Sequence, residues 1–220
     1  MSWIRRLLLF LGAIILLGLG LGAHYYFKGF SGFAFRRGLE ASRRPVELSE
    51  NRRLDRHFAD LRIFAIGHGY NAQLAFFVDM GLPSGKYRFF VADMEKDSVV
   101  LSGLVAHGCG NRRFSVQPDF SNIDGSNCTS LGRYRIGGAY NGRFGRAYRL
   151  YGLDSTNSQA LRRNVVLHSF AYVPEAETDP LPICNSRGCP MVSEGFLKQL
   201  EPLIDRSSRP ILLWIFNSKD

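Results

Sequence analysis

The sequence predicts a mainly β fold with a few helices, an α+β class, and three observations support this prediction. Short apolar and aromatic runs recur between turn residues, which is typical of strands. One segment, residues 193–205, has the clear apolar periodicity of a helix. The chain is 45% hydrophobic and contains 17 Phe, which is ample for the core of one medium-sized domain.

The predicted strands alternate with turns from residue 74 onward. Residues 74–79 and 86–93 are separated by Gly81-Leu-Pro-Ser-Gly85, which has the composition of a turn. Residues 94–97 close a hairpin that returns through residues 98–107. The remaining predicted strands are residues 133–137, 146–152, 164–168 and 210–216.

The predicted helix begins at Ser193 and reaches Asp205. A Ser side chain can accept a hydrogen bond from a free N–H of the first turn, so Ser193 is a suitable N-cap. The apolar residues that share one face are Phe196, Leu197, Leu200, Leu203 and Ile204. A second, short helix is expected to lead into residues 57–65.

The N-terminal region predicts a membrane segment. Residues 7–27 have no formally charged side chain except a protonated His24, and as a helix they would span about 31 Å, close to a bilayer core. One interpretation is an uncleaved signal-anchor; the other is a signal peptide that ends near Gly20-Leu-Gly22. The absence of an Ala-x-Ala site and the belt Tyr25-Tyr26-Phe27 favour the anchor. Residues 1–27 are assigned to this segment and residues 28–59 to a basic linker.

The net charge of +9, from 28 basic and 19 acidic residues, favours anionic partners such as nucleic acid, a lipid surface or an anionic wall polymer. The basic residues are scattered in pairs and form no aromatic-studded block. No zinc-finger or RNA-binding signature is present, so nucleic acid is not an expected partner.

The stretch from His168 to Pro190 contains the residues with catalytic chemistry. A free thiol titrates near about 8.5, so a Cys nucleophile needs a partner that stabilises its anion, and an imidazole can also carry the proton to a leaving amine. Gly188, just before Cys189, lets the backbone turn sharply and present N–H groups to an oxyanion. A His followed by Gly-Cys-Pro therefore favours acyl transfer through a thioester.

These residues resemble the murein L,D-transpeptidase catalytic domain family, whose signature is a His followed at similar distance by Ser/Thr-His/Arg-Gly-Cys. Here Ser186-Arg187-Gly188-Cys189 fits the signature, whereas His168 is followed by Ser169 where the family usually has Gly. Further stretches that resemble the family are residues 105–108, 120–122, 130–132, 140–142 and 150–153. The resemblance thus covers most of residues 60–216, which we assign to the catalytic domain.

The resemblance implies a curved β-sandwich with the Cys loop at one rim, and a mechanism. Cys189 would attack the bond between an L-centre and a D-centre in a peptidoglycan tetrapeptide stem, and His168 would keep it a thiolate and protonate the departing D-alanine. Backbone N–H groups of Gly188 and Cys189 would hold the oxyanion, and the backbone of Ser186 and Arg187 would orient the imidazole. The thioester would pass to an amine, giving a cross-link, or to water, giving a carboxypeptidase; both acceptors stay open.

The resemblance also implies a location in the cell envelope, with the domain on the outer (periplasmic) side of the cytoplasmic membrane, membrane-anchored or secreted. Positive charges on the two flanks of residues 7–27 would on their own place the domain in the cytoplasm. The implied substrate, peptidoglycan stem peptides, lies outside the membrane, and for this reason we expect the domain on the outer side. We expect a monomer that contacts the membrane through residues 7–27 and needs no metal or organic cofactor.

Several other side chains are predicted to contribute to the substrate site. His107, Tyr140 and Ser169 are substrate-binding candidates, although His107 and Tyr140 fit a structural role as well. Arg187 is expected to project from the nucleophile loop, where its guanidinium could meet a substrate carboxylate as a fork or remain a surface Arg.

The four cysteines allow two disulfides in an exported protein. Cys109 with Cys128 is the favoured pair, because each lies in a loop rich in Gly, Ser and Asn. The competing arrangement is a bridge between Cys184 and Cys189, which would turn the nucleophile loop into a structural staple. The cysteines lack a paired C-x-x-C spacing, so no zinc site is expected.

Two other functions remain open. One is a catalytically silent, membrane-tethered relative that binds the cell wall. The other is a different cysteine hydrolase; papain-like enzymes place Cys before His, and caspase-type sites need Gln-Ala-Cys, which this sequence lacks.

Overall fold

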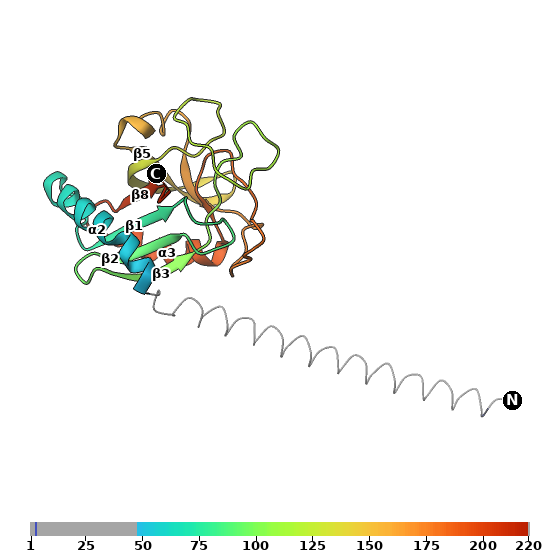
Figure 1. The fold of residues 1–220 in the computed structure, drawn as a ribbon, viewed down its shortest axis with the longest axis horizontal. Coiled ribbons are helices and arrows are strands. Elements are labelled where there is room, and N and C mark those ends of the chain that lie inside the picture. Colours follow the sequence, from blue (N-terminus) through green and yellow to red (C-terminus); the bar gives the residue numbers. More distant parts are fainter. Residues whose placement is uncertain (1–2, 4–47, 220) are drawn as a thin grey trace. The chain divides into compact units, whose positions relative to one another are not determined.

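The computed structural model describes Trp3 and residues 48–219. In the latter range the elements are α2 (Leu48–His68), β1 (Leu74–Asp79), β2 (Phe89–Asp93), β3 (Ser98–Gly103), β4 (Gly132–Gly142), β5 (Gly145–Gly152), the 3-10 turn η1 (Ser155–Asn157), β6 (Val166–Ser169), β7 (Met191–Val192), α3 (Glu194–Asp205) and β8 (Leu212–Phe216) (Figure 1). Strands dominate, which confirms the mainly β class.

The predicted membrane segment, residues 7–27, and residues 28–47 of the predicted linker lie outside the described residues. Among the residues that the structure describes, none of the helices combines the length and the apolar character needed to cross a bilayer.

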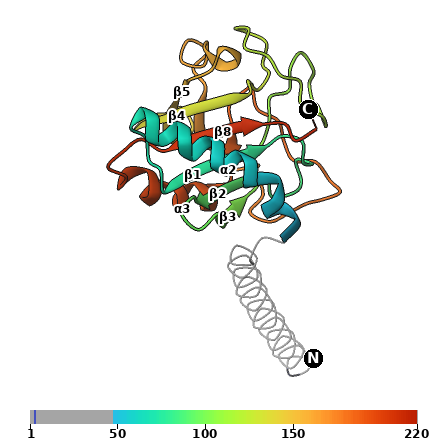
Figure 2. The ribbon, with the colours of Figure 1, turned by 60° about the vertical axis from the view of Figure 1, so that its left-hand side comes forward.

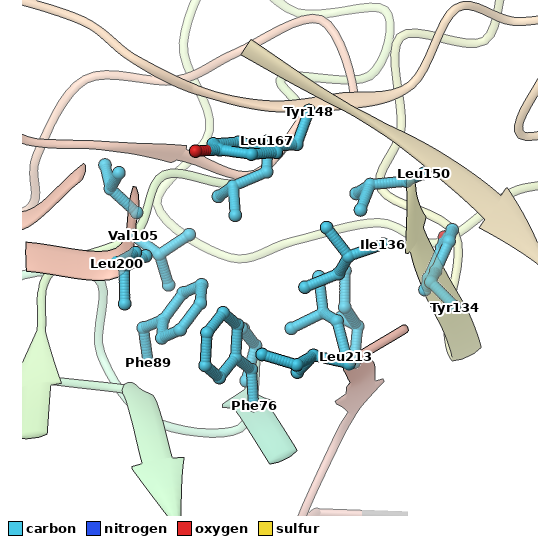
Figure 3. Packing of buried hydrophobic residues seen from close by; sticks show 14 of the residues in the cluster. Phe76, Phe89, Val105, Tyr134, Ile136, Tyr148, Leu150, Leu167, Leu200 and Leu213 are labelled. Carbon is cyan, nitrogen blue, oxygen red and sulfur yellow. The ribbon is translucent and has the colours of Figure 1, made fainter. Parts of the chain in front are cut away.

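The eight strands of residues 48–219 form one sheet in the order β3-β2-β1-β8-β4-β5-β6-β7. β8 is last in the chain but central in the sheet, parallel to β1 and antiparallel to β4. Both halves of the sheet bury side chains in a common core, where Phe76 and Phe89 of one half approach Tyr148 and Leu167 of the other (Figure 3). The expected sandwich is therefore one hydrogen-bonded sheet with a shared core.

α3 packs into this core through the face that the sequence predicted. Phe196, Leu197 and Leu200 are buried, and the ring of Phe196 meets that of Phe89 edge-on at 5.2 Å. The Ser193 hydroxyl accepts from the Phe196 N–H, which confirms the predicted N-cap. Burial of a Phe or Leu side chain contributes roughly 1.5–3 kcal/mol, so this short helix is held mainly by its apolar face.

α2 covers the opposite face of the β1–β2–β8 region (Figure 2). Its buried residues recur at helical spacing and pack on side chains such as Phe77 and Phe90; they are Leu54, Phe58, Leu61 and Ala65. The helix begins at Leu48, inside the range predicted as linker, because Leu54 and Phe58 already belong to this apolar stripe.

The short strands β5, β6 and β7 position the site. Ala147 of β5 pairs with His168 of β6, which in turn pairs with Met191 of β7. Leu167 and Val192 point into the main core. Because successive side chains of a strand alternate between faces, His168 and Met191 lie on the other side of the sheet.

Candidate active site

The nucleophile loop is held by the segment that follows β3. The Ser186 N–H donates to the His107 carbonyl at 2.8 Å, and the Cys109 N–H donates to the Ser186 carbonyl at 2.9 Å. Farther along, the Ala106 N–H donates to the Met191 carbonyl at 2.8 Å. These bonds place residues 106–109 along the loop that carries Cys189.

Gly188 is required by both its backbone and its surroundings. Its φ of +111° lies in the region that favours glycine, and a Cβ there would be 2.7 Å from the Cys128 carbonyl oxygen. Its N–H donates to the Ser186 hydroxyl at 3.0 Å. The Gly188 N–H, a predicted oxyanion donor, therefore already has a partner within the loop. Ser186 stabilises the turn through its hydroxyl and bonds to residues 107 and 109 through its backbone.

The Cys189 thiol is half-buried and donates weakly to the Asn164 carbonyl oxygen, with Sγ at 3.7 Å from it. Burial raises the pKa of this thiol, while a hydrogen bond from the Val166 backbone and the positive charge of Arg163 act to lower the pKa. Burial is the larger effect, so the resting group is a neutral thiol.

The His168 imidazole is only 4% exposed. Its Nδ1 lies 2.9 Å from the Ser169 carbonyl oxygen, which can only accept, so Nδ1 bears the proton and Nε2 the lone pair. The Phe144 ring stacks on the imidazole at 5.1 Å with a 16° tilt. Burial lowers the pKa of His168, and the neutral ring is therefore the resting form.

His168 and Cys189 lie on neighbouring segments of the sheet. His168 pairs with Met191, and Cys189 stands two residues before Met191, an offset of roughly 6–7 Å along a strand. Burial disfavours the charge on each group. Burial is the first cause of both pKa shifts, so it disfavours the predicted imidazolium–thiolate pair in the resting state. The backbone of Ser186 and Arg187 was predicted to orient the imidazole. In the structure the Ser169 carbonyl and the Phe144 ring contact it instead.

Of the two roles left open for His107, the structure is consistent with the structural one. His107 is completely buried. Its Nδ1 accepts from the buried Arg88 guanidinium at 2.9 Å, and Nε2 donates to the Ser115 carbonyl at 3.0 Å. Burial and the Arg88 charge lower the pKa of His107 to about 4. His107 thus supports the segment that holds Ser186.

The remaining predicted residues lie around this centre. Tyr140 of β4 pairs with Ala147, the neighbour of His168, so it stands two strands away from the imidazole, with the Arg149 guanidinium 4.6 Å from its ring centre. Ser169 is half-buried, and its carbonyl oxygen contacts the His168 ring. Arg187 is exposed on the nucleophile loop, where a substrate carboxylate can reach it.

All four cysteines are free thiols in this structure. The predicted disulfide between Cys109 and Cys128 is not formed, although their segments are adjacent through the Gly110 N–H, which donates to the Asn127 carbonyl at 3.1 Å. Each thiol instead lies 3.4 Å from a backbone carbonyl of its own loop. The competing bridge between Cys184 and Cys189 is not formed either. Among the described residues no group of three or more metal-ligating side chains is present.

Two residues of the site were missed by the sequence reasoning. Phe144, 49% exposed at the β4–β5 turn, stacks on the His168 imidazole and also meets Phe170 edge-on at 5.6 Å. Its signal was a large apolar residue inside the glycine turn Gly142-Arg-Phe-Gly145. Arg163, next to Asn164, had no signal beyond belonging to one of the basic pairs.

A cavity of about 620 Å³ lies between the loop at residues 110–112 and the loop at residues 119–128. Gly110 and Cys128 are in its wall, and these residues adjoin the nucleophile loop through Cys109 and Gly188. Arg112 and Asp119, 2.9 Å apart, offer both charges in the same wall.

The L,D-transpeptidase catalytic domain family model matches residues 58–214, which include His168 and Cys189. The chain belongs to this family. The resemblance read from the sequence is thereby confirmed for most of the L,D-transpeptidase domain.

Three solved structures illustrate the similarity. An L,D-transpeptidase from Xylanimonas cellulosilytica is 13% identical, with a TM-score of 0.38, over 69% of this chain and 67% of that one. The helical cell shape determining protein Pgp2 from Campylobacter jejuni is 11% identical, with a TM-score of 0.43, over 66% of this chain and 47% of that one. An L,D-transpeptidase from Mycobacterium smegmatis is 12% identical, with a TM-score of 0.40, over 66% and 58%.

The match thus spans about half to two thirds of the length of these solved chains. Curated protein sequences gave no significant match.

Proposed function

We propose that this L,D-transpeptidase domain transfers acyl groups of peptidoglycan stem peptides through a thioester on Cys189, with release of D-alanine. The observation that carries the proposal is the pairing of His168 with Met191, which brings the imidazole strand beside the Cys189 turn inside the range matched by the family. A base and a thiol on adjacent segments are the minimum that such chemistry requires.

The first step starts from neutral groups. As the substrate carbonyl approaches, the Cys189 proton leaves the Asn164 carbonyl and passes to His168 Nε2, because Nδ1 already donates to Ser169. The sulfur forms a bond to the carbonyl carbon, and the tetrahedral intermediate collapses with cleavage of the carbon–nitrogen bond. The imidazolium gives its proton to the departing amine of D-alanine. His168 thus acts as a general base, in place of a standing counter-ion.

The second step resolves the thioester. A neighbouring stem supplies an amine, whose nitrogen bonds to the carbonyl carbon as the carbon–sulfur bond breaks and a proton returns to sulfur by way of His168. Water in place of the amine gives the carboxypeptidase reaction. The cavity beside Gly110 and Cys128 is the proposed place for a peptide, since Arg112 and Asp119 can bind its charged groups.

The setting of this reaction is part of the proposal. Residues 1–27 would form a signal-anchor or signal peptide that contacts the membrane through residues 7–27, and residues 28–59 the basic connection to the domain. The domain, residues 60–216, would act as a monomer on the outer side of the cytoplasmic membrane. The composition of residues 7–27, apolar and free of acidic, Lys and Arg residues, supports this arrangement.

The proposal is tested by incubating the purified protein with tetrapeptide muropeptides. We expect a mass increase on Cys189 from the acyl adduct, together with release of free D-alanine. The Cys189→Ala variant should lose both signals, whereas Cys109→Ala, altered in a thiol of the neighbouring loop, should keep both. Absence of adduct and of D-alanine with a folded wild-type protein would rule the function out.

A catalytically silent wall-binding relative is the second candidate, and the raised pKa of Cys189 is the observation that favours it. Thiol alkylation at neutral pH separates the two. Burial raises the pKa of both thiols, so an active enzyme should be alkylated faster at Cys189 than at Cys184 only because His168 can take the proton of Cys189. Equal, slow alkylation of both cysteines, combined with binding to isolated peptidoglycan, would favour the silent module.

A further inference from the structure

Arg163 is the side chain that joins the 121–130 loop to the active site. Its Nη1 donates to the Ser121 carbonyl at 2.8 Å and to the Ser130 hydroxyl at 3.1 Å. Its Nη2 donates to the Cys128 carbonyl at 2.6 Å. The planar guanidinium is suited to such a task, since its donors have fixed directions. Nη2 also donates to the Ser126 hydroxyl at 3.4 Å, so one side chain contacts both ends of this loop and two residues between them.

The same guanidinium lies against the nucleophile turn. A Cβ on Gly188 would be 3.2 Å from Arg163 Nη2 and 2.7 Å from the Cys128 carbonyl oxygen. The backbone of Gly188 thus rests directly on the hydrogen bond between Arg163 and Cys128. Cys189 follows immediately, and the Arg163 charge is near enough to act on its thiol.

We propose that Arg163 is a positioning residue, which clamps the 121–130 loop onto the Gly188–Cys189 turn and supplies the positive charge that stabilises the Cys189 thiolate as it forms. This inference rests on the proposed role of Cys189 as the nucleophile. It gives the proton transfer to His168 a physical driving force, because a thiolate that appears in a half-buried site needs a nearby opposite charge.

The other titratable groups around Cys189 do not supply this charge. Burial lowers the pKa of His168, on the neighbouring strand, so its ring is neutral at rest. Burial raises the pKa of Tyr134 to about 12, and its hydroxyl stays protonated. Arg187 is exposed, so solvent screens its charge. Cys128 donates its thiol to the Ser126 carbonyl.

Arg162 offers a matched control. It is the preceding residue and carries the same charge, but its side chain is 74% exposed and faces Asp124 at 3.7 Å. Loss of Arg162 changes the net charge of the protein by the same amount as loss of Arg163. A difference between the two variants therefore reports position and not total charge.

The test is the pH dependence of Cys189 alkylation by iodoacetamide, followed at the Cys189 peptide by mass spectrometry in the full chain. An opposite charge a few ångströms away lowers a pKa by about 1–3 units. We expect Arg163→Gln to raise the midpoint of the alkylation profile by about one pH unit. Arg163→Lys, which keeps the charge, should stay close to the wild type. Arg162→Gln should not move the midpoint.

An unchanged midpoint in a folded Arg163→Gln variant overturns the inference, as does an equal shift in Arg162→Gln. If Arg163→Gln does not fold, Arg163→Met, which keeps much of the apolar stem and removes the charge, is measured in its place. A midpoint that rises in Arg163→Met but not in Arg162→Gln supports the inference, and a constant midpoint overturns it. Alkylation needs no peptidoglycan, so a failed muropeptide assay with the expected midpoints would contradict the proposed function alone.

Discussion

Two histidines, His107 and His168, have similar sequence surroundings but differ in their hydrogen bonds in the structure. Each ends an apolar run and precedes a small residue, and both are less than 5% exposed. His107 uses both ring nitrogens, one on Arg88 and one on the Ser115 carbonyl. His168 uses Nδ1 alone, on the Ser169 carbonyl, beneath an exposed aromatic ring.

The difference shows that burial alone does not separate His107, with partners on both ring nitrogens, from His168, the proposed general base. Both groups have a pKa below the ordinary value, and burial is the first cause for each. What distinguishes them is the second nitrogen. An imidazole with hydrogen-bond partners on both nitrogens has a structural role, whereas an imidazole with a partner on one nitrogen keeps a lone pair that can accept a proton.

The largest expected effect is on turnover. His168→Gln should lower the rate of D-alanine release from tetrapeptide muropeptides by roughly 10²–10⁴-fold, the usual range for loss of a general base. Its thermal unfolding temperature should change little, since the ring makes one hydrogen bond. Assays with a labelled tetrapeptide measure the rate. If the variant unfolds at a much lower temperature but keeps its rate of D-alanine release, His168 is a structural residue like His107.

His107→Ala should act on stability. It removes two buried hydrogen bonds and leaves a cavity beside Arg88, so the free energy of unfolding should fall by about 2–4 kcal/mol. Urea unfolding followed by circular dichroism measures this. The control is His68→Ala at the exposed end of α2, where Nδ1 bonds only to the Phe64 carbonyl and less than about 1 kcal/mol is expected. Equal losses in the two variants would contradict the comparison.

The same histidine predicts a pH dependence of stability. The pKa of His107 is about 4 in the folded protein, against about 6.5 when unfolded. The unfolded chain therefore binds a proton that the folded state refuses, so this contribution is complete above about pH 6.5 and is lost as the pH falls to about 4. Between about pH 7 and pH 4.5 the loss should reach about 2–3 kcal/mol. In His107→Gln, which lacks the titrating group, the unfolding curves should depend less on pH by that amount.

The smallest expected effect concerns the aromatic cover. Phe144→Ala should expose the His168 ring and raise its pKa toward the ordinary value, since burial is the first cause of the shift. The acidic limb of the pH–rate profile should then move up by about half a pH unit. Phe114→Ala, which changes a ring of similar exposure (47%), is the control and should leave the limb in place. An unmoved limb in Phe144→Ala would show that the ring does not shield the base.

Much of the sheet could be predicted from local sequence patterns, whereas the contacts of the site could be seen only in the folded structure. The runs at residues 74–79 and 146–152 and the capped helix at 193–205 follow from alternation, turns and one apolar face. The family signature indicated His168 and Cys189 as the candidate catalytic residues. Neither pattern could show that β6 pairs with β7, that Gly188 rests on a carbonyl of residue 128, or that Arg88 occupies one nitrogen of His107. Those contacts join residues far apart in the chain.

The placement of β8 between β1 and β4 has a consequence for how this domain comes into being. During synthesis, the strands on either side of that gap leave the ribosome first and have no edge-to-edge bonding to each other. β8, made after all of them, is the strand that pairs with both β1 and β4. In a nascent chain, Cys189 and His168 therefore lie in an incomplete sheet until β8 is inserted. In a chain truncated before residue 212, β1 and β4 would lack the strand that lies between them.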